Sequence, residues 1–122
     1  RLARAVWAAS EAWGKGGAFA LNIADPAARG HSVTAVRLSG DDGTRLRRWC
    51  ESEAGVTLGI GLGMAEPGTP EAGAFFRIAH MGHVNAHMTL GVLAVIDTGL
   101  KALGIAHGEG ALEAAARALA AD

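Results

Sequence analysis

The chain has 122 residues, half of them hydrophobic, which is enough for one compact domain with a single core. Its formal net charge is -1, and the sequence has no run of basic residues that could bind a phosphate backbone. We therefore expect no nucleic-acid partner. The single cysteine, Cys50, excludes an internal disulfide and favours a cytoplasmic location. Polar residues interrupt the longest apolar stretch, 88–103, too often for a membrane span.

Hydrophobic periodicity predicts a first helix, because Leu2, Val6, Ala9 and Trp13 recur at spacings of three and four residues. In chain order, the pattern then predicts strands over 18–23 and 33–38, a helix between positions 44 and 55, strands over 56–60 and 75–79, and helices over 84–103 and 111–121. Helices and strands do not alternate strictly. The sequence therefore predicts an α+β fold, in which helices cover a small, mostly antiparallel sheet of three to four strands.

A stretch rich in glycine and proline, 61–73, follows the third predicted strand. Gly59, Gly61 and Gly63 form a GxGxG run at its start, but a dinucleotide-binding fingerprint needs GxGxxG at the beginning of a helix. Backbone pliability explains these glycines better. A loop of this length in a compact domain is typical of a functional or mobile segment.

Three histidines near the fourth predicted strand form a candidate metal site. His83 and His87 are four residues apart, a spacing at which two imidazoles on one helix can share a zinc ion, and His80 lies close by. The segment has no intervening glutamate and no cysteine, so a strand-to-helix turn is the better interpretation, and we predict no metal ligand. Cys50 lies in a helical pattern that favours a buried small side chain over a nucleophile.

Arg77 is the candidate binding residue of the fourth predicted strand. Because side chains alternate between faces, Phe76 and Ile78 are expected to face the core and Arg77 to lie on the opposite face. Its guanidinium presents a rigid fork that can hold a carboxylate through two parallel hydrogen bonds. From these residues alone, an exposed or salt-bridged surface arginine is the favoured interpretation.

The segment 76–85, FRIAHMGHVN, followed by a long helix, resembles the class V aminotransferases of fold-type I. The likeness is greatest to the alanine–glyoxylate and serine–glyoxylate (serine–pyruvate) group, and the segments 25–29, 33–37 and 104–108 also fit it. The resemblance implies a homodimeric enzyme that carries pyridoxal 5'-phosphate (PLP) on a lysine and moves an amino group from serine or alanine to glyoxylate or pyruvate. It also implies that Arg77 binds the α-carboxylate of the substrate.

Two departures from that family pattern limit the assignment. Position 83 is often acidic in the family, whereas this chain has His83. Nothing here matches the family's cofactor lysine, and neither Lys15 nor Lys101 has its surroundings. We therefore expect 1–122 to be a C-terminal small domain of a longer chain, as its start at Arg1 also suggests. Its partner, the large PLP-binding domain, is absent, so this segment should be inactive alone and supply neither catalytic nor cofactor-binding residues.

Two alternatives remain at this point. One is a related transaminase that acts on another amine, such as pyridoxamine with pyruvate. The other is a non-catalytic α+β binding module that resembles this family in pattern alone.

Overall fold

The computed structural model describes residues 2–17, 19–21, 33–56, 58–60, 75–79 and 85–121. The helices are α1 (Leu2–Gly14), α2 (Asp42–Ala54), α3 (Ala86–Ala102) and α4 (Ala111–Ala120). The strands are β1 (Ala20–Leu21), β2 (Val33–Arg37), β3 (Gly59–Ile60) and β4 (Phe75–Ala79), and they form one antiparallel sheet in the order β1-β2-β4-β3. The expected mixture of helices with an antiparallel sheet is thus observed, and helices account for most of the described residues.

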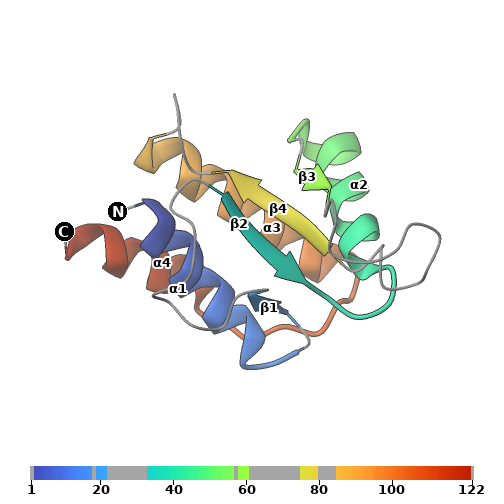
Figure 1. Cartoon of the computed structure of the whole chain (residues 1–122), viewed down its shortest axis with the longest axis horizontal. Coiled ribbons are helices and arrows are strands. Elements are labelled where there is room, and N and C mark those ends of the chain that lie inside the picture. The colour runs from blue at the N-terminus through green and yellow to red at the C-terminus, as the bar shows by residue number, and fades with distance from the viewer. Residues whose placement is uncertain are drawn as a thin grey trace.

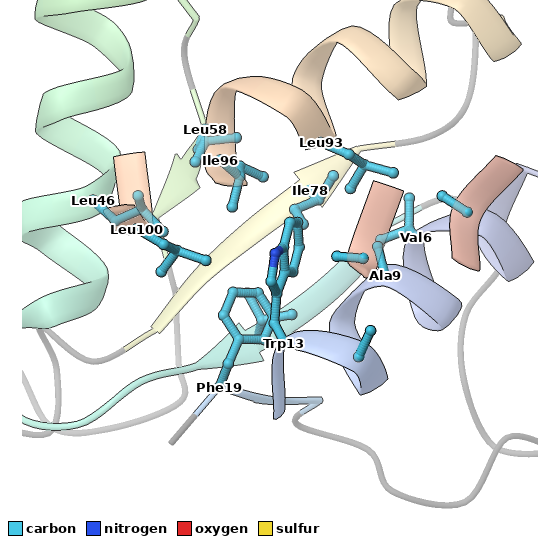
Figure 2. Close-up of a cluster of buried hydrophobic side chains, with 14 of the residues drawn as sticks. Val6, Ala9, Trp13, Phe19, Leu46, Leu58, Ile78, Leu93, Ile96 and Leu100 are labelled. Atoms are coloured by element: carbon cyan, nitrogen blue, oxygen red, sulfur yellow. The ribbon is translucent and has the colours of Figure 1, made fainter. Parts of the chain in front are cut away.

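The core lies between the sheet and the helices. Figure 1 shows α3 behind the β2–β4 pair, with α1 and α4 to one side and α2 to the other. Val36 of β2 and Ile78 of β4 are 0% and 2% exposed and pack with buried side chains of the helices. Figure 2 shows this cluster, to which α1 contributes Trp13 and α3 contributes Leu93. Burial of this apolar surface is the main contribution to the stability of the fold.

The first predicted helix is confirmed, and its apolar stripe faces the core. Val6, Ala9 and Trp13 are fully buried, and Leu2 packs against the cluster from its edge. The ring of Trp13 contacts that of Phe19, just beyond the helix, with centroids 4.8 Å apart. A tilted pair at this distance adds to the stabilisation that burial itself provides.

Two glycine-containing segments cross backbone to backbone beside α1. The turn after α1, with Gly16 and Gly17, lies against the loop between α3 and α4, and the Gly108 N–H donates to the Trp13 carbonyl at 2.7 Å. A Cβ added at Gly17 would lie 1.9 Å from the Ala106 oxygen. Glycine is therefore required for this close approach, which brings α4 against α1.

The third predicted strand, 56–60, is wrong at its beginning: β3 contains only Gly59–Ile60 among the described residues. The end of α2 explains the difference. Gly55 adopts a left-handed conformation with φ 67°, and the Val56 N–H donates to the Cys50 carbonyl at 3.0 Å. This C-terminal cap ties Val56 to the helix, so its N–H bonds to α2 and not to a strand.

The other predicted boundaries differ by a few residues. The Asn85 side chain accepts a hydrogen bond from the Met88 N–H at 2.9 Å, so α3 begins at Ala86 and not at 84, which lies outside the described residues. β1 is Ala20–Leu21, so Phe19 of the predicted 18–23 precedes the strand, while 18, 22 and 23 lie outside the described residues. The segment 61–73 also lies outside them. No helix in the described part of the chain is long and apolar enough to cross a membrane.

Candidate functional site

The candidate site is centred on Arg77, the third residue of β4. β4 is an inner strand, because it pairs with β2 on one side and with β3 on the other. In this register Arg77 lies opposite Ala35 of β2 and opposite Gly59 of β3. An inner strand is held by hydrogen bonds along both edges, so the backbone of Arg77 has a well-defined position.

The face of the sheet to which Arg77 belongs follows from its neighbours. Ile78 and Val36 are buried against the helices, whereas Arg37, which follows Val36, is exposed. Residues alternate between faces along a strand, and directly opposite residues of paired strands share a face. The register therefore assigns the positions of Ala35, Arg37 and Arg77 to the face away from the core. No described helix covers the viewer's side of the β2–β4 pair in Figure 1.

A row of three residues, Gly59, Arg77 and Ala35, crosses the sheet at this point. We call it the arginine row. Arg77 was predicted from the sequence but its two neighbours were not, because cross-strand pairing is not visible in a sequence. The one available signal was that Ala35 interrupts a run of β-branched residues, Val33, Thr34 and Val36.

The other residues considered from the sequence do not gather around this row. His87 is exposed on α3, while His80 and His83 lie outside the described residues. Among the residues that the structure describes, no three of His, Cys, Asp and Glu are placed to hold a metal ion. Cys50 is fully buried in α2, as its helical pattern predicted, and burial raises the pKa of its thiol to about 11.

A second polar group, which we call the Trp13–Asp97 network, lies beside α1 and was not foreseen. The indole N–H of Trp13 donates to Asp97 Oδ1 at 2.9 Å, and Lys101 Nζ donates to Asp97 Oδ2 at 2.9 Å. Lys101 also lies 3.3 Å from His107 Nε2 and 3.9 Å from Glu109. An aspartate inside the apolar run of α3 was the available signal, because such a residue needs a partner.

Lys101 of the Trp13–Asp97 network does not have the properties of a cofactor-binding lysine. The hydrogen bond from Lys101 to Asp97 raises the pKa of the Lys101 ammonium above its ordinary value, against a smaller opposing effect of burial, and half of this side chain is exposed. A lysine that forms a Schiff base needs a lowered pKa in a shielded pocket. Lys15, the other lysine, is exposed in the turn after α1. Neither lysine therefore has the surroundings of a Schiff-base lysine in the described part of the chain.

No family model and no curated protein matches the chain. The chain is similar to part of the crystal structure of ureidoglycine–glyoxylate aminotransferase from Bacillus subtilis, with a TM-score of 0.72 and 24% sequence identity. The similarity covers 95% of this chain and 28% of that chain. The chain therefore has the fold of a segment of that aminotransferase and spans 28% of its length.

Proposed function

We propose that the chain is the C-terminal small domain of a PLP-dependent class V aminotransferase and that Arg77 binds the substrate α-carboxylate. The observation that supports this most strongly is the place of β4, Phe75–Ala79. It puts Arg77 on an inner strand, on the sheet face away from the core, in a fold shared with part of an aminotransferase. The reaction is transfer of an amino group from serine or alanine to glyoxylate or pyruvate.

The chain's own contribution to this reaction is to hold the substrate. A guanidinium can donate two parallel hydrogen bonds to one carboxylate, which fixes the substrate's orientation as well as its position. Because both the amino-acid donor and the 2-oxo-acid acceptor carry a carboxylate beside the reacting carbon, one arginine serves both half-reactions. PLP and the groups that bind it belong, in this proposal, to the large domain of the same cytoplasmic, homodimeric enzyme.

The test uses the complete protein that contains this chain, with Arg77→Ala compared with Arg37→Ala. Both substitutions remove one arginine from the same face of neighbouring strands, but Arg37 lies outside the arginine row. Hydrogen bonds to a charged group contribute about 1.5–3 kcal/mol each. Arg77→Ala should therefore raise the KM for both donor and acceptor at least tenfold, whereas Arg37→Ala should change them less than about threefold.

Two outcomes would contradict the proposal. If Arg77→Ala left both Michaelis constants unchanged, Arg77 would be a surface residue that does not bind the substrate carboxylate. If the two variants lost affinity equally, the effect would be one of general positive charge and not of a specific carboxylate contact.

A further inference from the structure

The residues that flank Arg77 are unusual for their strands. β2 has the sequence VTAVR, in which Ala35 is the one small residue, and Ala35 is the residue opposite Arg77. On the other side Arg77 lies opposite Gly59. Alanine and glycine are both disfavoured in strands. Within the arginine row, small residues thus lie on both sides of Arg77.

Side-chain size in this row determines how a ligand can approach. Directly opposite residues of neighbouring strands have Cβ atoms about 5 Å apart, so a branched side chain at either position would fill the space beside the arginine. A carboxylate bound through two parallel hydrogen bonds must lie in the plane of the guanidinium with both oxygens accessible. A bulky neighbour would deny it one of the two bonds, or force the arginine out of its favoured rotamer.

We propose that Ala35 and Gly59 are specificity-determining residues, which set the affinity for carboxylate substrates by leaving both flanks of Arg77 free of large side chains. This inference rests on the proposed function of Arg77. It goes further, because it attributes part of the affinity to residues that make no polar contact themselves. The same row serves the amino-acid donor and the 2-oxo-acid acceptor, so both affinities should change together.

The decisive variant is Ala35→Val, again in the complete protein. Valine is favoured in strands, so stability should be kept or raised while the site is narrowed. The matched control is Ala20→Val. Ala20 lies opposite Arg37 on β1, so the same substitution on the same sheet face falls outside the arginine row. Gly59→Ala, which adds one methyl group on the other side of Arg77, is the second test variant.

The readouts are KM for donor and acceptor, kcat and the midpoint of thermal unfolding. Ala35→Val should raise both KM values about tenfold with kcat within about twofold and no fall in the melting temperature, and Gly59→Ala should raise both KM values in the same way. Ala20→Val should leave KM unchanged. A purely structural role for Ala35 would instead lower the melting temperature and leave both KM values alone.

The outcome for Arg77→Ala separates the two proposals. If that variant raises KM at least tenfold while Ala35→Val and Gly59→Ala both leave it within twofold, the carboxylate site stands and the inference about its flanks is overturned. If none of the three variants changes KM, both proposals fail. Should Ala35→Val not fold, Gly59→Ala alone decides the inference by the same criterion.

Discussion

The glycine crossing beside α1 allows a quantitative prediction for Gly108→Ala. A Cβ at position 108 would lie 2.1 Å from the Ala12 carbonyl oxygen and 3.1 Å from the Gly16 nitrogen. Real Cβ atoms essentially never approach another heavy atom within 3.0 Å, and both neighbours are backbone atoms that no rotamer change can move away. The loop must therefore withdraw from α1 by about 1 Å, which stretches the 2.7 Å hydrogen bond from Gly108 to Trp13.

The cost can be estimated from these two effects. Forcing an extra carbon into a packed site typically costs about 1–3 kcal/mol, and losing a backbone hydrogen bond costs about 1 kcal/mol more. With an unfolding entropy of about 2.1 cal/mol/K per residue, a loss of about 2–4 kcal/mol in a chain of this length lowers the melting temperature by roughly 8–16 °C. Gly17→Ala should behave similarly, because its Cβ would lie 1.9 Å from the Ala106 oxygen.

Thermal unfolding followed by circular dichroism measures this directly, with Gly91→Ala as the matched control. Gly91 is an exposed helical residue of α3, and an added Cβ there has no atom within 4 Å. Alanine at that position should raise the free energy of unfolding by up to about 1 kcal/mol. If Gly108→Ala melted within about 2 °C of the unchanged chain, the crossing would be compliant and the reasoning from backbone contact would be refuted.

Two further predictions concern titrating groups. Burial tends to raise the pKa of Asp97, but hydrogen bonds from Lys101 and Trp13 outweigh this effect and hold the pKa below its ordinary value of 3.8. The ionised Asp97 therefore stabilises the fold at pH values above 3.8, and this stabilisation is lost as the pH falls through the folded-state pKa. Asp97→Asn should therefore weaken the acid dependence of stability in urea titrations, and an unchanged pH profile would argue against the network. Because burial raises the pKa of the Cys50 thiol to about 11, the native chain should react with Ellman's reagent far more slowly than the urea-unfolded chain, and equal rates would show that this thiol is accessible.

Short-range sequence patterns predicted the helices and strands that such patterns determine. The stripe of α1 placed Val6, Ala9 and Trp13 in the core, because a helix repeats every 3.6 residues wherever it packs. The β-branched run of β2 likewise predicted a strand, and the strand predicted over 75–79 is β4. β3 was overestimated because the alternation of Val56 and Leu58 satisfies a strand pattern, while the left-handed Gly55 cap diverts Val56 to α2.

Contacts between distant residues could not be predicted in this way. Trp13 and Asp97 are separated by 84 positions, and nothing in either local pattern specifies that their side chains meet. The pairing of Ala35 and Gly59 with Arg77 depends on strand register, which packing of the whole sheet against the helices determines. Sequence reasoning therefore found the arginine and not its row.

Register links the candidate site to the core. Opposite residues share a face, so Val36 and Ile78 belong to the core face and Ala35 and Arg77 to the other. A slip of one residue between β2 and β4 would exchange the faces of one strand and direct either Arg77 or Ala35 toward the buried side chains. Burying an unpaired guanidinium costs several kcal/mol, so the arginine that we propose to bind substrate also disfavours the slipped register in which it would itself be buried.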